Sequence, residues 1–340
     1  MSILAVFFLL LFPETARLFP DALLVVDESG DVLRIFDAKS GAAPRSEARV
    51  GRGPHEVEVL ADGRIAAVSN FGTPGEPGRT VTLFEIDFGR TLATIDLGER
   101  TQPYGLEALP DGRLLVAAEG TKELLVVDPY RRRVVQRIRM GRDGYQLVVA
   151  TPDGSRAFLS SAQADLVTPV DLSPVRILRD IVTGRAPVGM DLTPDGKSLW
   201  VTGPETDSIW LIDAVDRGIF PRISARGFPT RVKITPDGKY ALVSCMRTGD
   251  IAVFDIAERR EVKRIPIAGE ALRREGPHLA RGGSSLPGPV DLLIEPNGRS
   301  AWVISENTPL ICRVDLETFT VSGSLNAGRA PGALAGRFVR

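Results

Sequence analysis

A short apolar string that ends in aspartate recurs seven times along this 340-residue chain. No other feature constrains the fold as strongly. The seven markers are Asp37, Asp87, Asp128, Asp171, Asp213, Asp255 and Asp315. Four of the six gaps between them are 41 to 43 residues long, and the gaps of 50 and 60 residues hold visible insertions at 70–80 and 269–288. A period of about 42 residues predicts one supersecondary unit repeated seven times.

A turn motif recurs with nearly the same spacing as these markers. Asp-Gly or Asn-Gly, usually after proline, occurs at positions 62–63, 111–112, 153–154, 195–196, 237–238 and 297–298. Between apolar runs these dipeptides predict hairpins, because they tolerate positive φ. Each unit therefore contains four predicted strands. The first runs into the turn, the second is apolar, the third ends at the aspartate, and the fourth resembles residues 134–138.

Four antiparallel strands every 42 or so residues, without helical periodicity, predict an all-β fold, a seven-bladed β-propeller. The first marker has no turn-bearing strand before it, whereas residues 331–337 occupy a first-strand position with no further unit after them. We therefore expect the last segment to complete the blade begun by residues 22–50 and to close the ring, which removes the open sheet edges.

The repeat resembles the YVTN-type β-propeller family, which includes YncE-like exported proteins and lactonase-like propellers. Residues 230–267 match it best, with Pro236-Asp237-Gly238-Lys239 in the turn and an apolar string before Asp255. The resemblance covers nearly the whole chain. It implies the fold and leaves the activity open, since one fold hosts different functions.

Composition limits the function classes. Lys and Arg number 42 against 43 Asp and Glu, which argues against a nucleic-acid partner. Two cysteines exclude a disulfide scaffold, and two histidines exclude a site that needs three imidazoles. The sequence predicts no metal site and no cofactor. We expect Cys245 and Cys312 to be buried free thiols, and the three tryptophans to pack between blades.

The markers and turns are predicted to be structural. An aspartate at the end of a strand accepts hydrogen bonds from backbone N–H groups of the following turn. Seven equivalent positions around a ring also lie too far apart to share one ion.

An arginine follows six of the seven markers by 13 to 15 residues. These residues, which we call the arginine ring, are Arg52, Arg100, Arg142, Arg185, Arg226 and Arg329. They fall in the connections between units, which a propeller gathers on one face near its channel. His55 and His278 lie in the same connections, and the second insertion adds Arg273, Arg274 and Arg281.

Two interpretations of the arginine ring remain open. The guanidinium groups either form a channel mouth that binds an anionic ligand or an acidic protein segment, or pair with acids in the loops between second and third strands. Those acids are Asp27, Glu28, Glu119, Asp165, Glu205, Asp207 and Glu306. Exposed pairs of this kind would leave no net field.

No spacing in the chain marks an enzyme. A Gly-x-Ser-x-Gly nucleophile elbow is absent. The enzymatic alternative is a lactonase-like hydrolase at the same face, for which His55, Arg100, Glu119 and Asn307 supply polar groups.

The amino terminus contains an apolar run at 3–12, about 15 Å long as a helix and too short to span a bilayer. It suits a secretory signal at 1–16, although no basic residue precedes it and Glu14 disfavours cleavage. A buried edge strand is the alternative. The sequence thus predicts an exported binding or scaffold propeller over 17–340, in the periplasm or medium, with the cytoplasm as second choice.

Overall fold

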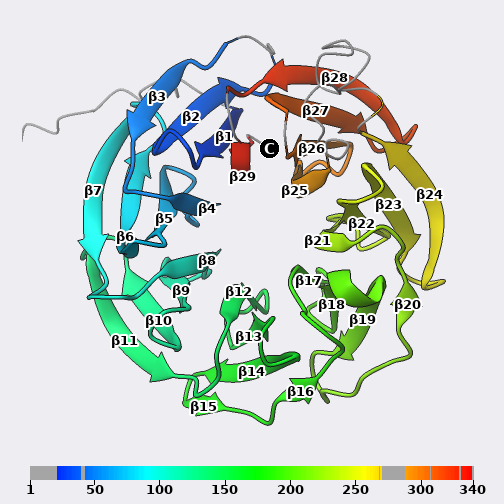
Figure 1. Ribbon diagram of the computed structural model, residues 1–340, viewed down its shortest axis with the longest axis horizontal. Coiled ribbons are helices and arrows are strands. Elements are labelled where there is room, and N and C mark those ends of the chain that lie inside the picture. The colour runs from blue at the N-terminus through cyan, green and yellow to red at the C-terminus, as the bar shows by residue number, and fades with distance from the viewer. Residues whose placement is uncertain are drawn as a thin grey trace, which may run out of the picture.

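Seven antiparallel sheets are arranged in a ring around a central axis in the computed structural model (Figure 1), and we call the region along this axis the channel. The structure describes residues 21–39, 43–267, 269, 288–306, 308–328 and 331–338. The predicted signal segment 1–16 lies outside the described residues, as do Arg273, Arg274, His278, Arg281, Asn307 and Arg329. The seven-bladed β-propeller predicted from the repeat is confirmed.

The first four blades comprise the following strands, from the channel outward. Blade 1 has β29 (Pro331–Arg337), β1 (Ala22–Asp27), β2 (Val32–Asp37) and β3 (Ser46–Arg49). Blade 2 has β4 (Pro54–Val59), β5 (Ile65–Thr73), β6 (Glu76–Glu85) and β7 (Arg90–Asp96). Blade 3 has β8 (Pro103–Ala108), β9 (Leu114–Ala118), β10 (Glu123–Asp128) and β11 (Arg133–Arg139). Blade 4 has β12 (Tyr145–Ala150), β13 (Arg156–Ser161), β14 (Leu166–Leu172), β15 (Val175–Ile177) and β16 (Ile181–Val182).

The remaining three blades follow the same order. Blade 5 has β17 (Met190–Leu192), β18 (Ser198–Gly203), β19 (Ser208–Asp213) and β20 (Ile223–Ser224), with the 3-10 helix η1 (Pro204–Thr206) between β18 and β19. Blade 6 has β21 (Pro229–Ile234), β22 (Tyr240–Cys245), β23 (Asp250–Asp255) and β24 (Arg260–Pro266). Blade 7 has β25 (Pro289–Ile294), β26 (Ser300–Ser305), β27 (Leu310–Asp315) and β28 (Thr320–Asn326).

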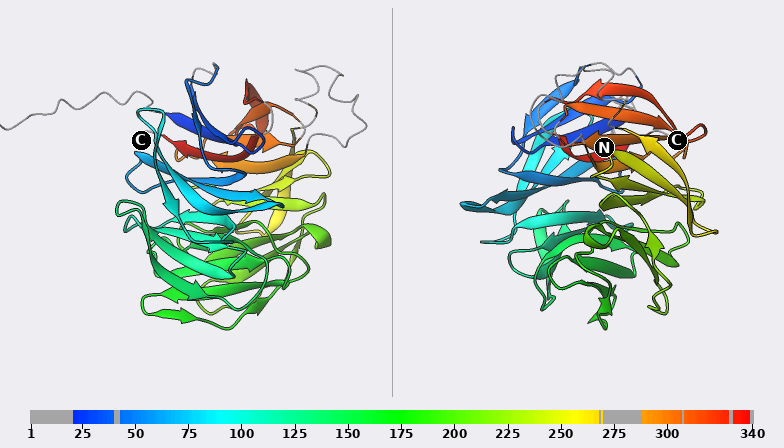
Figure 2. Two further views of the ribbon diagram at one scale, coloured as in Figure 1. Left: turned by 60° about the vertical axis from the view of Figure 1, so that its left-hand side comes forward. Right: turned by 45° about the vertical axis from the view of Figure 1, so that its right-hand side comes forward.

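The ring closes as predicted, by a strand from the end of the chain. β29 pairs antiparallel with β1 from Ala22 opposite Arg337 to Asp27 opposite Pro331. Figure 2 shows the first strands, in blue, and the last strands, in red, together in one part of the ring. Blade 1 is therefore built from both ends of the described chain.

Hydrophobic packing between blades forms the core. The described residues contain seven apolar clusters, each of which joins two neighbouring blades. Trp200, Trp210 and Trp302 are buried in these layers, and Cys245 and Cys312 are buried and not joined by a disulfide, all as predicted. Burial of one large apolar side chain contributes about 1.5–3 kcal/mol, so the interfaces between blades supply most of the stability.

The recurring polar residues have the predicted structural roles. Asp128 Oδ1 accepts a hydrogen bond from the Arg131 N–H at 2.8 Å, and Asp315 accepts two from the turn before β28. In the Asp-Gly turns the aspartate accepts from the N–H two residues on, as Asp237 does from Lys239 at 3.0 Å. The glycine of each turn takes positive φ, for example 71° at Gly238.

Two blades depart from the predicted four regular strands. The fourth strand of blade 4 is divided into β15 and β16, and that of blade 5 is reduced to β20. Pro169 lies in the middle of β14, where it has no N–H for the ladder toward a fourth strand. Pro221 lies just before β20 and interrupts the other ladder in the same way.

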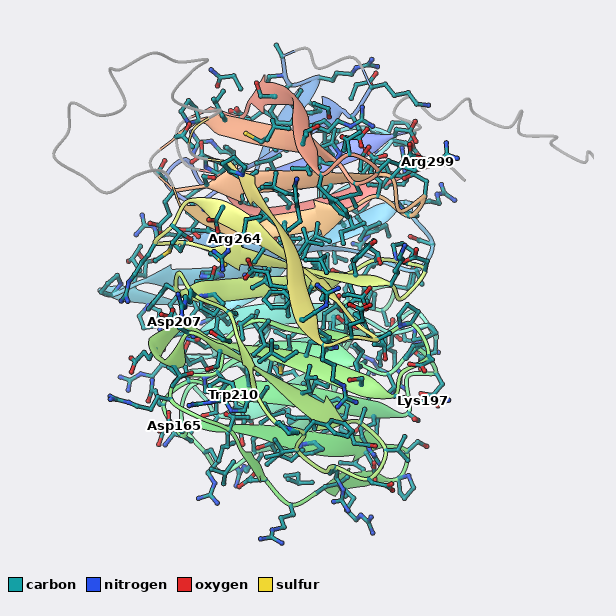
Figure 3. All side chains as sticks on the ribbon, turned by 90° about the vertical axis from the view of Figure 1, so that its right-hand side faces the viewer. Asp165, Lys197, Asp207, Trp210, Arg264 and Arg299 are labelled. Atoms are coloured by element: carbon teal, nitrogen blue, oxygen red, sulfur yellow. The ribbon has the colours of Figure 1, made fainter. Side chains whose placement is uncertain are left out.

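The ring has two distinct faces. Figure 3 shows Asp165 and Asp207 on one side and Lys197 and Arg299 on the other. We call the first the connection face, because it carries the loops between second and third strands together with the connections between blades. The two are tied by hydrogen bonds, as from the Ala186 N–H to Asp165 and from the Phe228 N–H to Asp207. The insertion at 70–80 extends the β5–β6 hairpin on this face. Among the described residues no helix is long and apolar enough to cross a membrane.

Candidate functional site at the channel mouth

A pocket of about 590 Å³ opens where the channel reaches the connection face. Its walls come from the starts of inner strands and from loops that follow second strands. The lining residues are Glu28, His55, Tyr104, Val188, Thr230, Arg231, Met246, Val290, Ser305, Glu306, Pro331 and Gly332. Five of the seven blades, together with the connection before β17, therefore contribute to one hollow.

His55 stands at the start of β4, as predicted, and belongs to an aromatic cluster. Its ring centroid lies 3.8 Å from that of Tyr104, and Phe71 packs edge-on against Tyr104 at 5.6 Å. The His55 Nδ1 atom is buried 3.6 Å from a carboxylate oxygen of Glu56. This packing fixes the imidazole in the pocket wall.

Two loop carboxylates, those of Glu28 and Glu119, lie near this histidine. Partial burial raises the pKa of Glu28, and the neighbouring charge of Glu56 adds to the effect while His55 opposes it. Burial likewise raises the pKa of Glu119, which faces His55 from the β9–β10 loop. Glu306 contributes a further carboxylate to the pocket. The mouth of the channel is therefore rich in negative charge.

An ion-pair network forms the floor of the pocket. The Arg231 guanidinium pairs with Glu56, and its Nε lies 3.6 Å from Asp291 Oδ1. Burial raises the pKa of the Glu56 carboxyl, but the charge of Arg231, together with His55 and the hydrogen bond from Arg231, outweighs this and holds the pKa at about 2. Glu56 is therefore ionised at every ordinary pH, and Arg231 is neutralised by carboxylates from two other blades.

A second layer of charges lies deeper in the channel, around a cavity of about 70 Å³. Burial lowers the pKa of Lys233, but the surrounding Asp191, Asp291, Glu58 and Glu107 outweigh this and raise it. Burial raises the pKa of Glu58 to about 7. Burial, with the charge of Glu58 added, raises that of Glu107 to about 8. These two carboxyl groups are therefore protonated in part at neutral pH.

Most of these carboxylates also bind the next blade. Glu107 Oε1 accepts a hydrogen bond from the Ala150 N–H at 3.2 Å, and Asp191 Oδ2 accepts one from Ile234 at 2.7 Å. Asp291 Oδ2 accepts one from Leu334 at 2.9 Å, on the closing strand. The acids therefore join neighbouring inner strands around the channel, which gives them a structural role.

The described members of the arginine ring lie outside the pocket lining. Arg52 pairs with Glu76, Arg142 lies 3.0 Å from Asp180, and Arg185 lies 3.2 Å from Glu205. Arg100 and Arg226 are exposed. Of the predicted site residues that are described, only His55 reaches the pocket, and anion binding by the arginines stays a prediction.

We expect the double variant Arg142→Ala/Arg185→Ala to melt within about 3 °C of the wild type, because exposed ion pairs contribute only about 0–1 kcal/mol each.

The same variant tests the anion site. If the ring binds anions, calorimetry at low salt will detect pyrophosphate binding by the wild type and weaker binding by the variant. If the wild type shows no salt-dependent binding of pyrophosphate, these arginines form surface ion pairs and no anion site.

The charged residues in the channel were not identified from the sequence, although the sequence contains a signal for them. The position four residues before each turn Asp or Asn holds Glu58, Glu107, Val149, Asp191, Lys233 and Leu293. Charge in an inner strand that otherwise packs apolar side chains indicates a position that faces the channel. Among the described residues, no group of three or more His, Cys, Asp or Glu side chains is arranged to hold a metal ion.

Comparison with known proteins identifies the fold. No family model and no curated protein matches the sequence. Hydrazine synthase from Kuenenia stuttgartiensis aligns with a TM-score of 0.68 and 18% identity, over 83% of this chain and 88% of that one. A functionally unknown protein from Desulfotomaculum acetoxidans DSM 771 gives 0.75 and 14%, over 94% and 99%. Dihydro-heme d1 dehydrogenase NirN in complex with DHE gives 0.67 and 16%, over 93% and 65%. At these identities the likeness extends to the β-propeller fold alone.

Proposed function

We propose that this protein is a ligand-binding β-propeller that holds a small organic molecule in the pocket at the channel mouth. The pocket itself is the observation that supports the proposal. Its volume of about 590 Å³ falls in the range typical of small-molecule sites. Ionised, hydrogen-bonding and aromatic side chains converge in it from five blades, and the rigid inner strands hold several of them in place.

Differential scanning fluorimetry of the full chain with a metabolite panel of amines, carboxylates, sugars and lactones tests this function. We expect at least one compound to raise the melting temperature of the wild type, since a ligand that binds only the folded state stabilises it. The variant Met246→Trp places a larger side chain in the pocket from a loop, and it should lose that response. The variant Val215→Trp, on the opposite face, serves as the control. Equal stabilisation of wild type and Met246→Trp by every hit would contradict a site in this pocket.

A hydrolase is the second candidate, and the position of His55 favours it. The imidazole lines the pocket while its Nδ1 faces Glu56 at 3.6 Å, an arrangement that orients a general base toward bound substrate. In this interpretation the pocket would polarise a lactone carbonyl and activate water. A lactone panel, assayed with and without divalent metal, should then show hydrolysis that His55→Ala abolishes. Rates equal to the buffer background exclude this candidate.

Family membership and export belong to the same proposal. The period of about 42 residues with its Pro-Asp-Gly turns supports membership of the YVTN-type propellers. An apolar amino-terminal run supports export to the periplasm or medium, where the second insertion would serve as a contact for a partner. Cell fractionation with mass spectrometry of the mature amino terminus tests this, and protein outside the cytoplasm that still begins at Met1 would contradict a cleaved signal.

A further inference from the structure

The charges around the channel-mouth pocket differ in sign from those of the arginine ring outside it. Glu28 and Glu306 line the pocket, and Glu56 and Asp291 flank Arg231 in its floor. Among the described residues, four carboxylates thus accompany one guanidinium. Since Glu56 and Asp291 already neutralise Arg231, the charges of Glu28 and Glu306 remain to attract a cation from solution.

A serine in the pocket wall provides a second and independent observation. Ser305, the last residue of β26, is only 2% exposed and lines the pocket. Its hydroxyl oxygen is buried and has no hydrogen-bond partner among the described residues. A buried hydroxyl without a partner is costly, and it becomes satisfied when a ligand N–H donates to it. Ser305 directly precedes Glu306, so the hydroxyl and a carboxylate come from the same turn.

The closing strand β29 belongs to blade 1, next to blade 7, and places Gly332 against the other carboxylate, that of Glu28. A Cβ atom at Gly332 would lie 2.6 Å from Glu28 Oε1, so a side chain at this position would force the Glu28 carboxylate to shift. The rings of His55 and Tyr104, tilted by 40° with their centroids 3.8 Å apart, complete the wall near Glu28. Aromatic faces attract organic cations, and the attraction strengthens when the cation is partly desolvated.

We propose that the ligand of this pocket is an organic amine, held as its ammonium ion by Glu28 and Glu306 and by a hydrogen bond to the Ser305 hydroxyl. The inference rests on the proposed binding function and specifies the chemical class of the ligand. A pocket of about 590 Å³ is much larger than a single metal ion requires, which favours a molecule over an inorganic cation.

Three four-carbon probes that differ only in their end groups test the class of ligand: 1,4-diaminobutane, 1,4-butanediol and succinate. In isothermal titration calorimetry of the full chain at low salt, we expect the diamine to bind in preference to the diol and succinate. Glu28→Gln and Glu306→Gln should each weaken diamine binding about tenfold, or about 1.4 kcal/mol, because each removes a charged hydrogen-bond acceptor for the ammonium group. Ser305→Ala should weaken it about threefold or more. Glu99→Gln, an exposed acid outside the pocket lining, should leave it unchanged.

The outcomes separate this inference from the proposed function. Preferential binding of succinate or the diol, with loss of binding in Met246→Trp, would overturn the amine class and leave the ligand pocket standing. Diamine binding that survives both Glu28→Gln and Glu306→Gln would place the amine elsewhere and overturn the inference. Absence of diamine binding would also overturn it. The proposed binding function, by contrast, fails only if no compound of the metabolite panel stabilises the wild type more than it stabilises Met246→Trp.

Discussion

A chain that lacks residues 331–340 is expected to lose its cooperative melting transition, or to melt at least 15 °C below the full chain. Without β29, blade 1 has no inner strand, and the backbone groups of β1 between Ala22 and Asp27 lose one of their two partners. The apolar clusters on either side of blade 1 lose Ala333 and Leu334. Burial of one leucine contributes about 1.5–3 kcal/mol, against about 5–15 kcal/mol for a whole domain.

Circular dichroism melts of the truncated and full chains measure this effect. A synthetic peptide of residues 329–340, added in excess, should restore part of the transition, because it can pair with β1 in place of the missing strand. A scrambled peptide of the same composition serves as the control. The point variant Leu334→Asp, which places a charge on a nearly buried side chain, should also lower the melting temperature. A truncated chain that melts within 2 °C of the wild type would disprove the closure.

Stability is also expected to fall steeply as the pH rises from about 6 to 9. In the folded state burial raises the pKa of Glu58 to about 7 and that of Glu107 to about 8. Their pKa in the unfolded chain is near 4.5, so in this range the folded state binds more protons than the unfolded state. The free energy of unfolding therefore decreases with rising pH, by up to about 1.4 kcal/mol per pH unit for each group. The stabilisation is fully present only below the unfolded-state pKa of about 4.5, and it is lost once the pH exceeds the two folded-state pKa values.

The double variant Glu58→Gln/Glu107→Gln should flatten this dependence, since glutamine keeps the shape and an acceptor oxygen but does not titrate. At pH 9 it should be more stable than the wild type by a few kcal/mol. Urea denaturation at pH 5, 7 and 9 measures the difference, with Glu99→Gln as the control. A wild-type stability that stays constant from pH 6 to 9, or a slope retained in the double variant, would show that these carboxyl groups do not titrate as expected.

The fold was predictable from the sequence because each blade is specified locally. The Pro-Asp-Gly turns, the strand before Asp255 and its equivalents lie within one period, so their spacing alone defines seven similar sheets. Closure by residues 331–337 followed from counting strands in the first unit. The divided outer strand of blade 4 and the shortened one of blade 5 were not predicted. Pro169 and Pro221 each remove one backbone N–H from a hydrogen-bond ladder that the repeat otherwise predicts.

The site was far less predictable, because its contacts join distant parts of the chain. Arg231 and Glu56 are 175 residues apart, and no local pattern indicates that they form a pair. The period placed the arginines in the connections between blades but did not fix the direction of long exposed side chains. Arg52 and Arg185 instead reach Glu76 and Glu205. His55 was located correctly because its backbone position in β4 determines where its short, packed ring lies.

The way blade 1 is assembled also sets the order of events during biosynthesis. Six blades have all their strands contiguous in sequence, whereas β1 to β3 are translated before the other six blades and their partner β29 is translated after them. The β1 edge therefore has no partner while the other six blades are synthesised. Such an edge can pair with other chains, so the liability to misassociation is greatest before β29 has been synthesised.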